Sequence, residues 1–213
     1  PKEIAYFDRG PINGEAMLSG GYWSSYWYNG NIYGSEMAGG IDVFRLKPSE
    51  FLSQNEIDAA MQFRLQEFNS QNQPKVTWEP TSAVAKAYMD RLTRSKSIAA
   101  ERVRAVNNAL SRVDSLRTGR EGNAKEALDQ LESLASQFDA DAAKASGVDQ
   151  KRYQALAETL RGRAARLLHR PTGRRRVGEH DEGLPVGAAV GGARAPLVLI
   201  LLTSTFPHSR TLR

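Results

Sequence analysis

Residues 22–46 have the sequence YWSSYWYNGNIYGSEMAGGIDVFRL, and this stretch decides the fold of the N-terminal part of the chain. Aromatic and β-branched residues surround Asn29-Gly30, a pair that favours a tight hairpin turn because both central residues need a positive φ. The pattern predicts strands at Tyr22–Tyr28, Ile32–Ser35 and Ile41–Leu46. So small a sheet has two faces to bury and few strands to bury them, which indicates one unit of a repeated all-β architecture.

The chain on either side of this stretch carries weaker signals. Ile4–Asp8 is a candidate strand. Ser53 and Glu56 have the spacing of a capping box, which predicts a helix that begins there and ends near Phe68. A further helix is predicted at Thr81–Leu92, where apolar residues recur every four positions.

Residues 96–168 are rich in Ala, Leu, Glu, Gln and Arg, a composition that favours helix. Apolar residues recur at alternating spacings of three and four, which predicts helices at Ile98–Leu116, Ala124–Ala143 and Gln150–Leu168. Three amphipathic helices joined by short turns predict an up-down-up bundle. The expected core positions are Val103, Val106, Leu110 and Val113; Leu128, Leu131, Leu134 or Ala135, Phe138 and Ala142; and Tyr153, Leu156, Leu160, Ala164 and Leu167.

The composition changes again at His169. Eighteen of the 28 residues 169–196 are Gly, Ala, Arg or Pro, and residues 169–213 carry +4 of the net charge of +5. Two interpretations stay open: a disordered basic tail, or out-of-frame or read-through translation of GC-rich DNA that is not native protein. Both exclude the tail from the fold. The rest of the chain is nearly neutral and has no basic face at helical spacing, so we expect no specific nucleic-acid binding.

The residue types limit the chemistry that the folded part can perform. The chain has no cysteine, and its three histidines, His169, His180 and His208, all lie in the tail. This excludes Ser-His-Asp and Cys-His triads and Cys- or His-ligated zinc from the folded part, so we assign no catalytic residue, no metal ligand and no cofactor. Carboxylates remain in the β part, and a pair such as Asp8 and Glu36 could do acid–base work if brought together. Turn hydrogen bonds or solvated charges are the favoured roles for the group, which comprises Glu3, Asp8, Glu15, Glu36 and Asp42.

Two other groups have both a structural and a functional interpretation. The aromatic residues of the first strand suit carbohydrate stacking, but such residues usually pack between neighbouring sheets, and we favour packing. They are Tyr22, Trp23, Tyr26, Trp27 and Tyr28. Arg161, Arg163, Arg166 and Arg170 could contact phosphates or anionic lipid, whereas arginines at a helix C-terminus also simply suit the helix dipole.

Five short motifs occur in order along residues 1–60: YFDRGP at 6–11, GYWSSYWYNG at 21–30, IYGSE at 32–36, GIDVF at 40–44 and SQNEI at 53–57. As a set they resemble the final blade of LVIVD-repeat proteins. Those proteins are β-propellers, mostly bacterial and mostly predicted to be exported or surface-located. Residues 100–168 are similar to the FIMAH-type helical module that often ends exported bacterial proteins.

The resemblance implies a C-terminal fragment of a longer propeller protein located outside the cell or at its surface. The expected fold class is α+β. Residues 1–47 form an incomplete antiparallel propeller blade, 48–95 a helical connector, 96–168 a three-helix bundle and 169–213 the disordered or non-native tail. A propeller closes by packing neighbouring blades, so a single blade leaves both faces and its strand edges unprotected. The resemblance carries no catalytic residue over to this chain, and the residues of any binding site stay unknown.

Three functional hypotheses result. The first is a non-catalytic binding or scaffold module whose partner is a protein or a cell-surface component. The second is a fragment of a propeller enzyme whose active-site residues lie in further N-terminal blades. The third is contact between the Arg-rich end of the last helix and an anionic surface. No transmembrane segment is predicted, because the apolar run Pro196–Leu202 is too short to span a bilayer.

Overall fold

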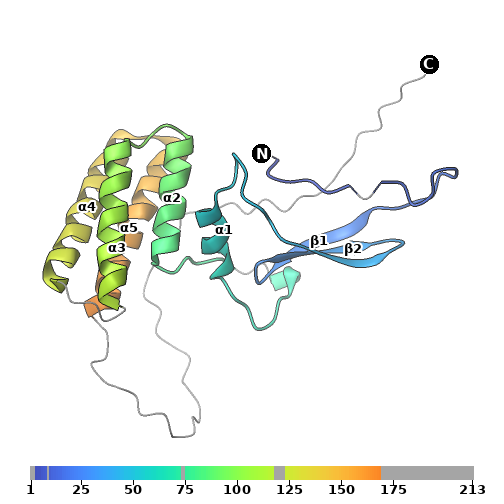
Figure 1. Cartoon of the computed structure of the whole chain (residues 1–213), viewed down its shortest axis with the longest axis horizontal. Helices are drawn as coiled ribbons and strands as arrows, with labels where there is room; N and C mark the ends of the chain where they lie inside the picture. The colour runs from blue at the N-terminus through green and yellow to red at the C-terminus, as the bar shows by residue number, and fades with distance from the viewer. Residues whose placement is uncertain (1–2, 9, 73–74, 118–122, 169–213) are drawn as a thin grey trace, which may run out of the picture. The chain divides into compact units, whose positions relative to one another are not determined.

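The computed structural model describes residues 3–8, 10–72, 75–117 and 123–168 (Figure 1). The predicted tail, with His169, His180, His208 and Arg170, lies outside the described residues. Within them the chain forms a three-stranded sheet and five α-helices, which confirms the predicted α+β class. In chain order the elements are β1 (Tyr22–Tyr28), β2 (Asn31–Glu36), β3 (Gly40–Phe44), α1 (Gln54–Met61), a 3-10 turn (Ser70–Asn72), α2 (Ser82–Arg94), α3 (Ala100–Arg117), α4 (Ala124–Lys144) and α5 (Gly147–Leu168).

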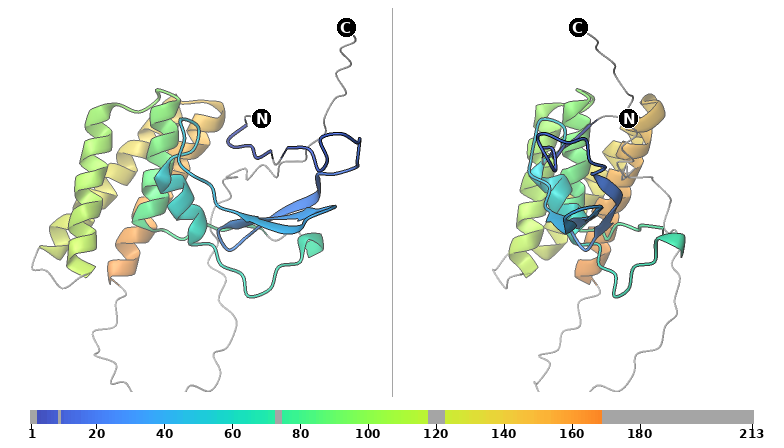
Figure 2. Two further views of the ribbon diagram at one scale, coloured as in Figure 1. Left: turned by 45° about the vertical axis from the view of Figure 1, so that its right-hand side comes forward. Right: turned by 90° about the vertical axis from the view of Figure 1, so that its right-hand side faces the viewer.

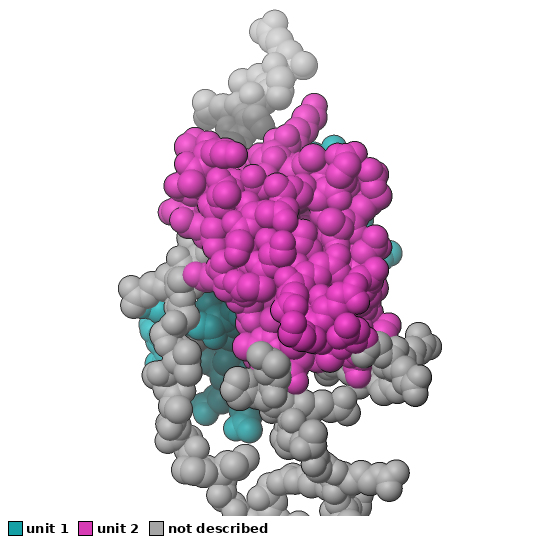
Figure 3. All heavy atoms as spheres, turned by 90° about the vertical axis from the view of Figure 1, so that its left-hand side faces the viewer, with its two compact units in different colours: residues 1–78, 197–213 teal, residues 79–196 magenta. Residues whose placement is uncertain are grey.

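The described chain divides into two compact units, a sheet unit up to Trp78 and a helical unit from Glu79, which Figure 3 colours separately. This division differs from the predicted boundaries, which assigned residues 48–95 to a connector and 96–168 to three helices. The structure instead splits the predicted connector. Its first helix, α1, belongs to the sheet unit, and its second, α2, packs against α3 and α5 in the helical unit.

The sheet is antiparallel with the strand order β1-β2-β3. Asn29 and Gly30 form the β1–β2 turn with φ values of 49° and 91°, so the positive φ values expected of this pair are confirmed. The predicted strand at Ile4–Asp8 is wrong, because these residues form no strand. Asp8 instead accepts a hydrogen bond from the Gly10 N–H at 2.8 Å.

Helix α1 begins as predicted and ends earlier than predicted. The Ser53 side chain accepts the Glu56 N–H at 3.1 Å and the Glu56 carboxylate accepts the Ser53 N–H at 2.8 Å, which completes the capping box. The helix ends at Met61 and not near Phe68. The reason is that the backbone of Leu65 is taken up by the Asn29 side chain of the hairpin turn, so it cannot continue the helical hydrogen bonds.

The helical unit has a continuous apolar core. Figures 1 and 2 show α2, α3, α4 and α5 side by side, and each consecutive pair packs together, as do α2 and α5. The helix periodicity correctly predicted most of the buried positions, with α2 added to the three helices expected. The largest fully buried side chains are Phe138, Met89, Leu92, Leu110, Leu131, Leu156, Leu160, Val106 and Val113.

Polar side chains also join the elements of the helical unit. Asp114 of α3 accepts hydrogen bonds from Ser82 of α2 at 2.9 Å and from the buried Arg163 of α5 at 2.6 Å. Elsewhere, Asp149 of α5 accepts from Ser97 and pairs with Arg152 at 2.6 Å. The first contacts connect α3 with α2 and α5, and the second connect α5 with the segment between α2 and α3.

The contacts around Asp149 shift the pKa values of two side chains, Asp149 and Tyr153. Partial burial by itself raises the pKa of Asp149, but hydrogen bonds from Ser97 and Ser95 and the pair with Arg152 outweigh it and lower the pKa. The neighbouring Tyr153 donates its hydroxyl to the Ser97 carbonyl, and burial raises the pKa of this phenol. The ionised aspartate and the neutral tyrosine are therefore the forms that this end of the helical unit stabilises.

Candidate binding surface on the sheet

The turn between β1 and β2 is held by the chain that follows α1. The Asn29 side chain accepts the Leu65 N–H at 2.8 Å and donates to the Leu65 carbonyl at 2.9 Å. The Tyr28 hydroxyl lies 3.1 Å from the same carbonyl, and Arg64 donates to the Asn29 carbonyl at 2.6 Å. We call these contacts the hairpin clasp. It fixes the tip of the hairpin and thereby the direction of β1 and β2.

One face of the sheet is covered from within the sheet unit. A Cβ atom at Gly34 would lie 2.7 Å from the Tyr22 ring, so glycine is needed there for the rings to cross β2. The Phe44 ring packs edge-on against Tyr22 with centroids 5.9 Å apart, and Phe7 lies over Phe44 at 4.7 Å. Tyr22 also donates its hydroxyl to Asp42. Aromatic rings therefore cover this face, and its carboxylate, Asp42, has a hydrogen-bond donor.

The opposite face carries a row of residues that cross all three strands. Tyr26 pairs with Tyr33, and Tyr33 pairs with Val43, so the three side chains share one face. Ile41, two residues before Val43 on β3, lies on the same face. Phe68 packs near Tyr26 with ring centroids 6.2 Å apart, but Ile41 and Val43 stay 73% and 57% exposed. We call Tyr26, Tyr33, Ile41 and Val43 the open face.

The aromatic group of β1 divides between packing and exposure. Tyr22 and Tyr28 are half-buried, and Trp27 stacks on Phe63 with centroids 6.1 Å apart. Trp23 is different, because it is 77% exposed. Packing thus accounts for three of the five aromatics within the sheet unit, whereas Trp23 and the 40%-exposed Tyr26 are available to a partner.

The carboxylates of the sheet unit have separate partners. The buried Glu36 accepts the Gly21 N–H at 3.2 Å and the Ala38 N–H at 2.8 Å, and it also accepts the Gly39 N–H. Asp8 takes part in the local turn with Gly10. The structure does not join Asp8 and Glu36 as an acid–base pair, and it supports the favoured prediction of turn hydrogen bonds. Glu3 and Glu15 are exposed.

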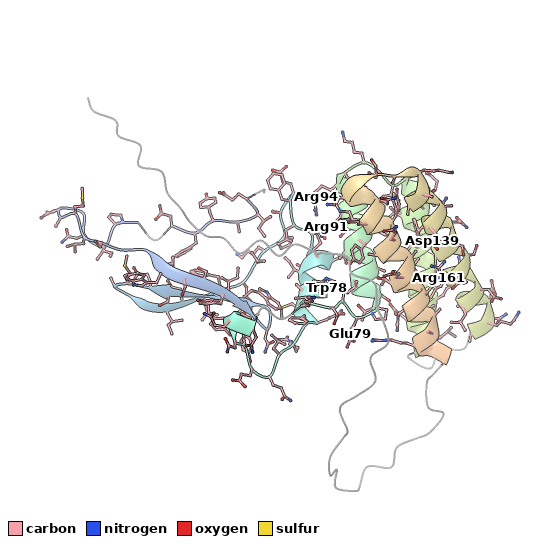
Figure 4. All side chains as sticks on the ribbon, turned by 180° about the vertical axis from the view of Figure 1, so that it is seen from behind. Trp78, Glu79, Arg91, Arg94, Asp139 and Arg161 are labelled. Carbon is pink, nitrogen blue, oxygen red and sulfur yellow. The ribbon has the colours of Figure 1, made fainter. Side chains whose placement is uncertain are left out.

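The Arg-rich end of α5 makes ion pairs inside the helical unit. Arg161 pairs with Asp139 at 2.5 Å and Glu132 at 3.0 Å, and these hydrogen bonds raise its pKa (Figure 4). Arg163 is buried against Asp114, and Arg166 pairs with Glu79 at 3.0 Å. These side chains already have carboxylate partners, so contact with an anionic surface would compete with existing pairs.

Neither a metal centre nor a membrane span is evident in the described ranges. Within them, no three or more His, Asp or Glu side chains gather closely enough to hold a metal ion. Likewise, none of the described helices has the length and apolar character needed to cross a bilayer.

Sequence reasoning missed two parts of this site. It did not assign a role to the exposed Ile41 and Val43, although the alternation Ile-Asp-Val-Phe at 41–44 is a signal that two side chains share one face. It also missed the hairpin clasp, which joins residues 35 to 37 positions apart and leaves no local pattern.

No protein-family model, curated protein or solved structure matches this chain. The resemblance to LVIVD-repeat and FIMAH-type modules therefore stays a prediction from the motifs.

Proposed function

We propose that the chain is a non-catalytic binding or scaffold module of an exported or cell-surface bacterial β-propeller protein. In this proposal the sheet is an incomplete blade, and the helices form a bundle that acts as a spacer or surface-association element. The partner is a protein or a cell-surface component.

The small buried core of the sheet unit carries this proposal. In the described residues up to Trp78, Ala59 is the one apolar side chain that is buried. A three-stranded sheet with half-buried aromatics and an exposed Ile41 and Val43 has too little burial to be stable on its own. Further β-structure packed on the open face would supply the missing burial, as neighbouring blades do in a propeller.

The helical unit supports a spacer role by a different property. Its four helices bury Leu, Val, Met and Phe side chains among themselves, and Arg161 and Arg166 on its surface are paired with carboxylates. A unit that completes its own core can hold a neighbouring module without needing a partner. No contact among the described residues favours the alternative of a propeller enzyme, so we do not propose it.

The first experiment is to sequence the gene upstream of the codon for Pro1. The proposal expects in-frame repeats similar to residues 1–60. An upstream sequence with no such repeats would overturn the propeller assignment.

The second experiment measures binding between those upstream repeats and this chain by isothermal titration calorimetry. Ile41→Glu and Val43→Glu are expected to weaken binding at least tenfold, because each places a charge on a face that must be desolvated. Val148→Glu is the matched control, since Val148 is 63% exposed on α5 and lies outside the open face. Equal affinity for the three variants and the unaltered chain would exclude the open face as the contact.

A further inference from the structure

Strand β1 has one edge that no described strand covers. The sheet order places β1 outermost and β2 in the centre, so β1 pairs on one side. The turn pairs Tyr28 with Asn31, and alternate residues of an antiparallel ladder point toward and away from the neighbouring strand. Ser25 and Trp27 therefore direct their backbone N–H and C=O groups away from β2. The register shift between Tyr22 and Ser24 falls at Trp23, and the ladder is regular from Ser24 to Tyr28.

Apart from the register shift between Tyr22 and Ser24, this edge lacks the features that normally prevent strands from pairing. Exposed edge strands usually carry charges or proline, because an unpaired backbone is a template for another strand. Residues 22–28 contain neither, and their composition has high β-propensity. The other edge is better guarded, since β3 contains Asp42 and is followed by Arg45, Lys47 and Pro48. Of the two edges, β1 is the one open to addition of a strand.

The sequence of β1 is also complementary to itself. YWSSYWY is nearly symmetric about Ser25, with Trp23 and Trp27 on either side and Tyr22 and Tyr28 at the ends. In an antiparallel pair, outward-directed residues face outward-directed residues, so a two-fold axis can pass through Ser25. That register brings Trp27 next to Trp23 of the second copy, where the register shift of β1 lies, and the other end repeats the contact by symmetry.

We propose that β1 pairs antiparallel with β1 of a second copy of this chain, with the two-fold axis at Ser25. The pairing joins two three-stranded sheets into one. It covers Trp23, which is 77% exposed in the single chain, with an aromatic cross-strand neighbour. The two strands carry no charge, so they approach without repulsion. The proposal goes beyond the function proposed above and does not depend on it, because it concerns the edge of the sheet and not its open face.

The first test is sedimentation equilibrium of the full chain between about 1 and 100 µM. A dimer is expected, and Trp23→Glu is expected to raise its dissociation constant about tenfold or more by removing both aromatic pairs. Val148→Glu is the matched control, because Val148 is 63% exposed on α5 and lies outside the sheet, and it should leave the dissociation constant unchanged. A monomer across the whole range, or equal weakening by both variants, overturns the proposal.

The second test uses the absence of cysteine from the chain. Residues of a hydrogen-bonded antiparallel pair have Cα atoms about 5.5 Å apart, within the range of Cα separations that a disulfide spans. Ser25→Cys should therefore give a covalent dimer under mild oxidation, whereas Ile41→Cys should stay monomeric on a non-reducing gel. Cross-linking through Ile41→Cys in place of Ser25→Cys would assign the contact to β3 and overturn the proposal. This test also covers the case in which Trp23→Glu fails to fold.

Discussion

The helical unit buries its own large apolar side chains, whereas the sheet unit exposes several of them. In α2–α5, side chains such as Phe138 and Leu156 are completely inaccessible to solvent. In the sheet unit, Trp23, Ile41 and Val43 are each more than half exposed. Both units have helices or strands with well-formed local signals. The difference teaches that correct local structure does not ensure a core, because four helices can surround a common interior and three strands cannot.

The largest expected effect tests whether α2 belongs to the helical core. Residues 79–168 should unfold cooperatively, whereas residues 98–168 should lose most of their stability. The shorter fragment lacks Val84, Tyr88, Met89 and Leu92, which are buried in the full chain. At about 2 kcal/mol for each large side chain, the loss is comparable with the whole stability of a small domain. Urea denaturation followed by circular dichroism at 222 nm measures both fragments, and equal stability would show that α2 is only a connector.

The next prediction concerns the stability of the sheet unit, which should be most sensitive to substitution in the hairpin turn. Gly30→Ala places a Cβ atom 1.9 Å from the Met61 sulfur at a residue with φ of 91°. Backbone strain and overpacking together should cost about 3 kcal/mol. The three tryptophans all lie within residues 1–78, so tryptophan fluorescence reports on the sheet unit alone.

Gly40→Ala is the matched control for this prediction. Gly40 has a φ of 93°, but nothing lies within 4 Å of the position its Cβ would take. It should therefore show only the cost of backbone strain, about 1–2 kcal/mol. If the two variants were equally destabilised, the close approach of the added Cβ atom to Met61 would contribute nothing to the free energy of unfolding.

A smaller effect is expected from the ion pair between α3 and α5. Asp114→Ala leaves the buried Arg163 without its carboxylate partner and should cost about 2 kcal/mol in the helical transition. Arg161→Gln removes an exposed pair and should cost less than about 1 kcal/mol. Chemical denaturation of both variants gives the comparison, and the reverse order would mean that exposure does not decide the strength of these pairs.

The smallest expected effect is the loss of stability caused by Asp149→Asn, which should depend on pH. Because the folded state lowers the pKa of Asp149, the stability gained from its ionisation is fully present above its unfolded pKa. That stability is lost as the pH falls through the folded value. Asp149→Asn should therefore cost about 1 kcal/mol at pH 7, and the difference should begin to shrink below about pH 4 and disappear only below the lowered pKa of the folded state.

Urea denaturation at pH 7 and pH 3 measures this difference. Asp129→Asn serves as the control, since Asp129 is 68% exposed and pairs with Lys125 of its own helix. Its effect should stay below about 0.5 kcal/mol at both pH values. A constant cost of Asp149→Asn at both pH values would refute the role of the ionised carboxylate.

The sequence by itself determined the features that depend on neighbouring residues. The bounds of β1, the Asn29-Gly30 turn and the capping box at Ser53 and Glu56 agree with the structure. The apolar faces of α3, α4 and α5 also match most of the predicted core positions. Each of these follows from hydrogen bonds or periodicity within a few residues, which a single sequence displays directly.

Only the tertiary structure decided the features that join distant residues. The end of α1 at Met61 depends on Asn29, and the inclusion of α2 in the helical unit depends on α3 and α5. The same holds for Asp114, which Arg163 approaches from 49 positions away. Such contacts require the chain to fold back on itself, so their energy comes from partners that no local pattern identifies. The local pattern therefore predicted which elements form, and packing decided where they end and which side chains remain exposed.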